Sequence, residues 1–494
     1  MRATIIRRMA AMLTADTNAA EPTVSARVAR VSLVLLLTIN LFNYIDRYIL
    51  AAVEPELRKE FFPQAAGGPA VSAKDELARA MSSTGWLATA FLISYMVTAP
   101  LFGAIANRMS RWVLIAIAVT VWSLASGASG LAATFAVLLI TRCFVGVGEA
   151  GYGPAAPALI AELYSAKNRG FIMALFYMAI PVGSALGYVF GGLITAKMDG
   201  VGGIHGWRWP FFLVVLPGIA LAIWALMMRK HEPARHVPAI PAADPAVAAE
   251  NGGRPAAKPR FSVRQYLSIF KIPSYTLDTA GMTAMTFAIG GFSFWLPAYL
   301  VDHAHVGGDG ASPKEVLSAV NFKFGVIMAV CGITATLAGG WLGDYFKRHF
   351  SGSYFVVSAA GILLSALFIV LMIHTPFPTA WVWLTLAVFF LFLNTGPSNT
   401  ILANVTSPAN RAQAFAVNIF VIHALGDAIS PPILGQLVGK YSWNAALYLV
   451  VAVMVVASAL WLWGAVYLKR DEERAVSGAP VEGRGFPVIE PSEK

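Results

Sequence analysis

The sequence predicts an all-α membrane protein of twelve transmembrane helices, arranged as two pseudo-symmetric six-helix bundles. The 494-residue chain is 57% hydrophobic and only 13% charged, and its mean hydropathy is +0.65. Soluble proteins average about 25% charged residues. In addition, the chain contains twelve apolar stretches long enough to cross a bilayer, and a short loop pattern recurs at the same place in each half.

Each apolar stretch is expected to form one helix, because about 20 residues at a rise of 1.5 Å each cover the hydrocarbon core. In chain order the expected spans are 31–53, 83–105, 112–133, 136–161, 170–196, 209–229, 273–300, 317–343, 353–374, 379–404, 411–439 and 443–468. They divide the chain into a flexible tail (1–27), a first bundle (28–230), a cytoplasmic linker (231–272), a second bundle (273–470) and a flexible tail (471–494). The linker is rich in Pro, Ala and basic residues, and residues 261–270 are expected to form a short amphipathic helix at its end.

Features of the individual stretches support this assignment in chain order. The fourth and fifth spans carry glycines at helical spacing, which let neighbouring helices approach closely. The seventh span is rich in aromatic residues, and the tenth contains Gly396 and Pro397, a pair that interrupts membrane helices. Tryptophans near span ends fit an interfacial belt: Trp112, Trp207, Trp209, Trp341, Trp381 and Trp443.

The distribution of basic residues predicts the orientation. Most of the 36 Lys and Arg residues lie in the tails, the linker and the loops on the same side, so both termini are expected in the cytoplasm. This rule also explains the net charge of +10, and we expect no nucleic-acid partner. The N-terminus does not resemble a signal peptide. We expect a multi-pass protein of the bacterial inner (plasma) membrane.

Polar residues interrupt the first span. Asn40, Asn43 and either Asp46 or Arg47 fall along one stripe of a helix, with Tyr44 beside them. A charge at the bilayer centre costs about 2.5–3.5 kcal/mol on insertion scales, so such residues usually face a protein interior or a watery cavity. We interpret the stripe as part of a substrate or ion pathway. The alternative is a polar contact that only joins helices.

The fourth span carries the charges expected to complete a proton-coupling network. Arg142 lies at about the depth of Asp46 and Arg47, and Glu149 lies about two turns deeper. We hypothesise that Asp46 interacts with Arg142 and that Glu149 lies within reach of Arg47; which of Asp46 and Arg47 faces the cavity stays open. If Glu149 pairs with Arg47 in one conformation only, its proton affinity depends on conformation. The alternative is a set of structural ion pairs.

A loop pattern follows the second span and recurs after the eighth. The residues of the two copies are Gly103, Asn107, Arg108 and Arg111, then Gly340, Asp344, Lys347 and Arg348. We expect both loops to hold the cytoplasmic side of the two bundles together by charge pairs. Asn107 supplies no carboxylate, so the first copy is expected to close more weakly.

These loops resemble the signature of the major facilitator superfamily, Gly-x-x-x-Asp-(Arg/Lys)-x-Gly-(Arg/Lys). The first copy has Asn107 in place of Asp and Ser110 in place of the second Gly, and the second copy keeps Asp344 but has Tyr345 and Lys347. The fourth span resembles the superfamily's Arg-x-x-x-Gly-x-Gly motif at Arg142, Gly146 and Gly148. With twelve spans and the repeat, the chain is identified as a member of this superfamily over about residues 28–470. This resemblance implies the major facilitator fold and transport by alternating access.

Within the superfamily, the chain resembles the Spinster family in the stretches 43–48, 85–100, 148–151 and 411–432. The resemblance implies export or flipping of amphipathic lipids, such as lysophospholipids or sphingosine-phosphate-like molecules, and coupling to protons. The Asn-Tyr-x-Asp-Arg stretch alone also resembles anion:cation symporters for sugar acids and other organic anions.

Further candidate substrate contacts lie in the second half. His423 and Asp427 are four residues apart, hence on one helix face, and form either a second proton site, a headgroup contact or a structural pair. Asn394 and Asn399 flank the expected helix break and are predicted to line the cavity. Trp295 belongs to the aromatic run that is expected to contact an acyl chain. Asp278, near a span end, is explained by snorkelling.

The leading hypothesis is a proton-coupled transporter of a lysophospholipid or another amphipathic lipid, and the alternative is an organic-anion symporter of the same fold. We find no paired catalytic carboxylates with a metal, no nucleophile elbow and no phosphate-binding loop, so a membrane enzyme or sensor is not favoured. The expected partners are membrane lipids, the proton and a small amphipathic or anionic substrate. We expect a monomer without a cofactor or metal.

Overall fold

The computed structural model describes residues 24–63, 70–106, 108–164, 172–173, 175–233, 268–304, 306, 310–407 and 411–477. Within these ranges the regular structure is helical, and twelve segments are long and apolar enough to cross a membrane. The expected amphipathic helix lies, but for its last residues, outside the described residues, as do most of the linker and tails and the gating-loop residue Asn107.

The first bundle contains six spans. They are α2 (Ala26–Phe61), α3 (Ala70–Ala106), α4 (Arg111–Gly130), α5 (Phe135–Leu163), α7 (Ala179–Lys197), and α8 (Trp209–Leu213) with α9 (Val215–Met228). Two short 3-10 turns, η1 (Val201–Gly203) and η2 (Gly206–Arg208), connect α7 to α8. Side chains of Ser25, Ser110 and Thr134 cap α2, α4 and α5 by accepting backbone N–H bonds.

The second bundle repeats this plan with two interrupted spans. It consists of α12 (Pro273–His303), α13 (Pro313–Lys347), α14 (Ser353–His374), α15 (Ala380–Phe392) with α16 (Thr395–Val405), α17 (Arg411–Ile422) with the π-helical turn η5 (His423–Asp427) and α18 (Ser430–Lys440), and α19 (Trp443–Ala465). A further helix, α20 (Leu468–Ser477), follows the last span. The predicted break of the tenth span is confirmed, because α15 ends and α16 begins on either side of Asn394.

The expected spans are confirmed, but several of their ends are not. The largest difference is at α3, which begins at Ala70 rather than at residue 83. Residues 74–80 are polar but contain strong helix formers, so the helix continues past its apolar part. Hydropathy marked where a helix can lie in lipid and not where the helix begins.

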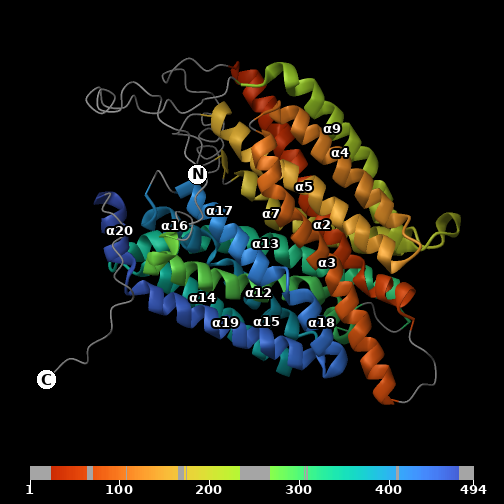
Figure 1. The fold of residues 1–494 in the computed structure, drawn as a ribbon. Helices are drawn as coiled ribbons and strands as arrows, with labels where there is room; N and C mark the ends of the chain where they lie inside the picture. Colours follow the sequence, from red (N-terminus) through yellow and green to blue (C-terminus); the bar gives the residue numbers. More distant parts are fainter. Residues whose placement is uncertain are drawn as a thin grey trace, which may run out of the picture.

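The two bundles form a V that is open at one end (Figure 1). We call the open end, where α2 begins and α9 ends, the linker end, and the opposite end, which carries η1 and η2, the far end. The helices that meet between bundles are chiefly α3 with α18 and α7 with α13. Close approach at the far end depends on Gly435, where an added Cβ would lie 2.6 Å from the backbone oxygen of Met81.

The apolar core reflects the same arrangement. One cluster of buried apolar residues includes members of both bundles, such as Leu50, Met81, Tyr188, Trp295 and Phe324. A separate cluster fills the linker half of the first bundle. The bundles therefore share a core toward the far end, whereas the linker half of the first bundle has a core of its own.

Candidate functional site

The polar stripe of α2 divides between two surroundings. Asn40, Asn43 and Asp46 are buried within the first bundle, and Asn40 Nδ2 donates to the backbone oxygen of Phe176 at 2.8 Å. Arg47 instead lines a cavity between the bundles. The alternative left open by the sequence is thereby settled: Arg47 faces the cavity and Asp46 faces a neighbouring helix.

Arg47 forms an ion pair with Glu149 of α5. The Arg47 Nη2 atom lies 2.5 Å from Glu149 Oε2, and the Glu149 side chain is only 1% exposed. Arg47 Nε and Glu149 Oε1 are buried without a hydrogen-bond partner. The pairing inferred from helix depth is thus present, and each partner keeps a polar atom that can take another contact.

Asp46 does not pair directly with Arg142. Its Oδ1 atom accepts a hydrogen bond from the hydroxyl of Ser126 on α4, and its Oδ2 atom has no partner. No ion pair joins Asp46 to Arg142, although their charges are close enough to influence each other. The expected direct contact with Arg142 is therefore not formed, and the Asp46 carboxylate bonds Ser126 instead.

A cavity of about 130 Å³ lies between the bundles and contains both arginines. Arg142 lines it while remaining 1% exposed, and its Nε and Nη1 atoms have no hydrogen-bond partner. The other polar lining residues are Tyr48, Ser293 and Asp427. The remaining wall is mainly apolar and includes Leu50, Phe91, Leu92, Ile289 and Phe294. This arrangement can hold an anionic group against an otherwise apolar surface.

Aromatic rings surround Arg47, and two of them, those of Phe91 and Tyr95, were not assigned from the sequence. Its guanidinium carbon lies 4.7 Å from the ring centre of Phe91, 5.0 Å from that of Tyr44 and 6.0 Å from that of Tyr95, distances at which a cation is attracted to a ring face. The spacing of Phe91 and Tyr95, one helical turn apart, was the available signal. The sequence offered no signal that could have identified Ser126, because a serine in an apolar span is common. Tyr44 contacts Arg47 but does not line the cavity.

The second bundle contributes Asp427 to the cavity, and its carboxylate lies 2.9 Å from Nδ1 of His423. The two residues begin and end the π-helical turn η5, a deviation from α-helix that is frequent at functional sites. The expected His423–Asp427 pair is present, and only Asp427 lines the cavity.

Three further predicted substrate contacts also lie outside the lining of this cavity. Asn394 is buried and donates to the backbone oxygen of Leu391 at 2.6 Å, while Asn399 is exposed and donates to that of Thr395 at 2.8 Å. Each amide thus bonds its own helix at the interruption. Trp295 is buried, and its indole N–H donates to the backbone oxygen of Pro431 at 2.7 Å. None of the three lines the cavity, and their contact with a substrate stays a prediction.

The gating-loop residues make contacts within their own bundles. Arg111 forms an ion pair with Glu162, and Lys347 Nζ lies 2.6 Å from Glu472 of α20. Asp344 accepts a hydrogen bond from the hydroxyl of Tyr354 at 2.8 Å. Between the residues that the structure describes at this end, no ion pair joins the two bundles. Gly103 and Gly340 have open space around them, and Arg108 and Arg348 are exposed.

Asp278 corrects a prediction about the second bundle. Its side chain is fully buried, and its Oδ1 atom accepts a hydrogen bond from the indole of Trp461 at 3.0 Å. Snorkelling does not explain this residue. Among the described residues, no group of three or more His, Cys, Asp and Glu side chains could hold a metal ion.

Comparisons with known proteins agree with this architecture. A family model described as the Major Facilitator Superfamily matches residues 36–423. The chain is 30% identical over 475 residues to protein spinster homolog 1 of Xenopus laevis, covering 92% of this chain and 83% of that protein. The mouse protein of the same name is 31% identical over 464 residues, covering 90% and 81%.

Solved structures show the same fold. A bacterial homolog of the human lysosomal transporter Spinster, in an inward-facing and unoccupied conformation, has a TM-score of 0.63 at 18% identity and covers 91% of this chain and 98% of its own. A D-xylose–proton symporter has a TM-score of 0.63 at 19% identity, covering 87% and 96%. The family model spans most of the chain and the curated relatives align over nine tenths of it; the chain therefore belongs to the major facilitator superfamily and, within it, to the Spinster family.

Proposed function

We propose that this transporter moves a lysophospholipid or another amphipathic lipid by alternating access, driven by coupling to protons. The observation that carries the proposal is the combination of two arginines and apolar walls in one cavity, with one arginine paired to a buried carboxylate. Family membership supports secondary active transport, and the residues of the cavity support the choice of substrate and ion.

The lining of the cavity matches an amphipathic molecule. Arg142 presents buried guanidinium N–H groups without partners, and such groups bind phosphate or carboxylate oxygens with good geometry. The apolar residues around it suit an acyl chain. Asp427 on the opposite wall adds a negative charge that can contact a cationic group of the same headgroup.

The proposed proton coupling rests on competition between Glu149 and the substrate for the Arg47 guanidinium. While Glu149 is charged, it competes with an anionic substrate for the Arg47 guanidinium. Protonation of Glu149 removes that competition and makes Arg47 available to the substrate. Proton binding and substrate binding then favour each other, and the coupling is reciprocal. Asp46 and Arg142, whose charges are close to each other, belong to the same proposed network.

The sidedness of the cycle follows from the positive-inside prediction. With both termini in the cytoplasm of a bacterial cell and the protein in the inner membrane, the linker end faces the cytoplasm. The present conformation is then inward-facing. We further propose that the protein works as a monomer, because each chain contains a complete cavity.

An organic-anion symporter is the second candidate. The partnerless guanidinium of Arg142 in the cavity favours it, because a small carboxylate would satisfy the same donors. The predominantly apolar wall is less suitable for a sugar acid, whose hydroxyl groups need hydrogen-bond partners.

Uptake into proteoliposomes distinguishes the two candidates. Purified protein is reconstituted, a pH gradient is imposed, and entry of a fluorescent lysophospholipid is compared with entry of a radiolabelled sugar acid. Gradient-dependent movement of the lysophospholipid alone supports the lipid proposal. Movement of the sugar acid alone supports the symporter, and lysophospholipid movement that ignores the gradient contradicts proton coupling.

A further inference from the structure

The two bundles are joined at the far end by an ion pair. Asp199 follows the last turn of α7, and its carboxylate pairs with the ammonium group of Lys314 in the first turn of α13. Within the described ranges this is the one ion pair that connects the bundles. The two side chains are 31% and 30% exposed, so water screens their attraction only in part.

The carboxylate of Asp199 is fixed by its own loop. Its Oδ1 atom accepts a hydrogen bond from the backbone N–H of Gly206 at 2.8 Å. The turn between them has positive φ angles at Gly200, Gly202 and Gly203, of 75°, 63° and 73°, a conformation that other residues rarely adopt. The hydrogen bond therefore orients the Asp199 carboxylate within this turn.

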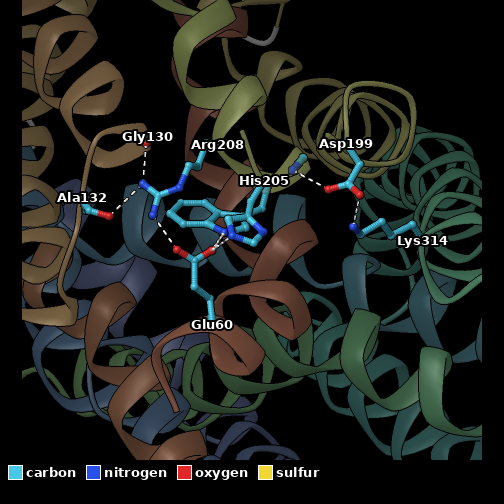
Figure 2. A network of polar contacts seen from close by, with 9 residues as sticks. Glu60, Gly130, Ala132, Asp199, His205, Arg208 and Lys314 are labelled. Atoms are coloured by element: carbon cyan, nitrogen blue, oxygen red, sulfur yellow. Dashed lines mark hydrogen bonds and ion pairs between the residues drawn. The ribbon is translucent and has the colours of Figure 1, made fainter. Parts of the chain in front are cut away.

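That loop is attached to the rest of the first bundle (Figure 2). The Trp207 indole N–H donates to Glu60 Oε2 at 2.5 Å, and Arg208 Nη2 lies 2.5 Å from Glu60 Oε1. Arg208 Nη1 also donates to the backbone oxygens of Gly130 and Ala132, each at 2.8 Å. Because these contacts reach α2 and the end of α4, Asp199 moves with the first bundle as a unit.

Lys314 lies at a position that disfavours a lone cation. The N-terminus of a helix carries a partial positive charge, and α13 begins with a capping box formed by Ser312 and Glu315. The helix dipole opposes a lysine in this first turn, and nearby carboxylates offset that effect. Glu315 is one such carboxylate within the capping box, and Asp199 of the other bundle is the one that pairs directly with the Lys314 ammonium group.

The Asp199–Lys314 contact depends on the conformation. It continues the packing of α13 against α7, and α13 also contacts α2, where Asn321 Nδ2 donates to the backbone oxygen of Ala52 at 3.1 Å. When the far end opens, the ends of α7 and α13 separate and the ion pair cannot be maintained. Its energy therefore contributes to one conformation only, which is the condition for shifting an equilibrium.

We propose that Asp199 and Lys314 form a far-end latch that sets the ratio of far-end-closed to far-end-open molecules in the transport cycle. The inference rests on the alternating-access part of the proposed function and is independent of the substrate and the coupling ion. Loss of one partner is expected to favour the open form, and exchange of the two charges is expected to restore closure.

Distance measurements test the latch without transport. Leu131 and Tyr441, exposed at the far ends of different bundles, are replaced by spin-labelled cysteines in a protein with Cys143→Ser and Cys331→Ser. Their separation is measured in lipid nanodiscs for Asp199→Lys, Lys314→Asp and the double exchange.

The variant Lys314→Gln is included because a neutral residue at this partly exposed site preserves folding. The control is Lys59→Glu, which breaks an exposed ion pair within α2.

Each charge reversal is expected to increase the population with a long separation, and the double exchange to return it toward the original value. Lys314→Gln should raise the open-to-closed ratio about two- to fivefold, the range for partly exposed ion pairs, while Lys59→Glu leaves it unchanged. An unchanged distribution in Lys314→Gln together with either reversal overturns the latch. A double exchange that stays as open as the single reversals also overturns it. Uptake results for lipid or sugar acid have no bearing on these outcomes.

Discussion

Neighbouring residues of a helix point about 100° apart, and in α2 this rotation gives Asp46 and Arg47 different partners. Asp46 is held by Ser126 of α4, whereas Arg47 reaches Glu149 and the cavity. The sequence predicted that these charges meet because their depths along the helices match. It could not predict which one faces the cavity, since that depends on how α2 is rotated against its neighbours.

Glu149→Gln tests the coupling role of the buried carboxylate. The amide keeps the size of the side chain but can neither bind a proton nor carry a charge, so Arg47 is released at every pH. We expect uptake by proteoliposomes to become independent of pH while the protein still folds. Glu56→Gln, which affects a surface pair with Lys59, serves as the control. A variant at position 149 with the original pH profile would exclude this residue as the coupling site.

Ser126→Ala tests the support of Asp46. The change removes the one hydrogen-bond donor to a carboxylate that is 1% exposed. Leaving a buried acceptor without its partner costs about 1–3 kcal/mol, so the midpoint of thermal unfolding in detergent should fall. Ser123→Ala is the matched control, because its hydroxyl is buried in the same helix without a partner. Equal midpoints for the two variants would contradict the assigned role.

At the scale of helices, apolar length identified every span, whereas contacts between helices decide where several of them end or bend. The interruption at Asn394 was predicted from Gly396 and Pro397, but its two asparagines bond their own helices and not the cavity. The π-helical turn at His423 carries no comparable signal in the sequence. The additional helix α20 falls in a segment expected to be a flexible tail, and packing against the second bundle stabilises it.

Asp471 of α20 tests this packing. Its Oδ2 atom accepts the backbone N–H of Ser274 at 2.9 Å and so caps the start of α12, which has no cap of its own. Asp471→Ala is expected to destabilise the protein by about 1–2 kcal/mol, the usual effect of losing a cap, as measured by thermal unfolding. The exposed neighbour Glu473→Ala should be neutral. If both substitutions have the same effect, α20 does not support α12.

For the whole molecule, the sequence predicted two bundles and their approximate limits but not the conformation in which they lie. A transporter sequence must be compatible with both ends of its cycle, so periodicity and motifs do not select one of them. The gating loops illustrate the point: their charges were expected to join the bundles, and here Arg111 and Lys347 pair within them. The far-end pair between Asp199 and Lys314 was not foreseen, because its partners are 115 residues apart without a motif.

The far-end latch is expected to be insensitive to pH in the physiological range. The hydrogen bonds from Lys314 and from the Gly206 N–H lower the pKa of Asp199 below its ordinary value. A carboxylate that the closed form holds in its charged state stabilises that form fully above the ordinary aspartate pKa, about 3.9, and loses this effect only as the pH falls below it. In Glu149→Gln, the separation between labels at Leu131 and Tyr441 should therefore be constant from about pH 5 to pH 8. A separation that changes in this interval would mean that His205 or another group controls the latch.

The apolar cluster shared by the two bundles has a consequence for a divided chain. Produced alone, a polypeptide ending near residue 233 or beginning near residue 268 would expose the apolar residues through which the bundles share that cluster and should aggregate on extraction from the membrane. Produced together in one cell, the two polypeptides should associate through these complementary surfaces, and affinity purification of one polypeptide should yield both. Such a complex would show that the halves recognise each other without a covalent connection.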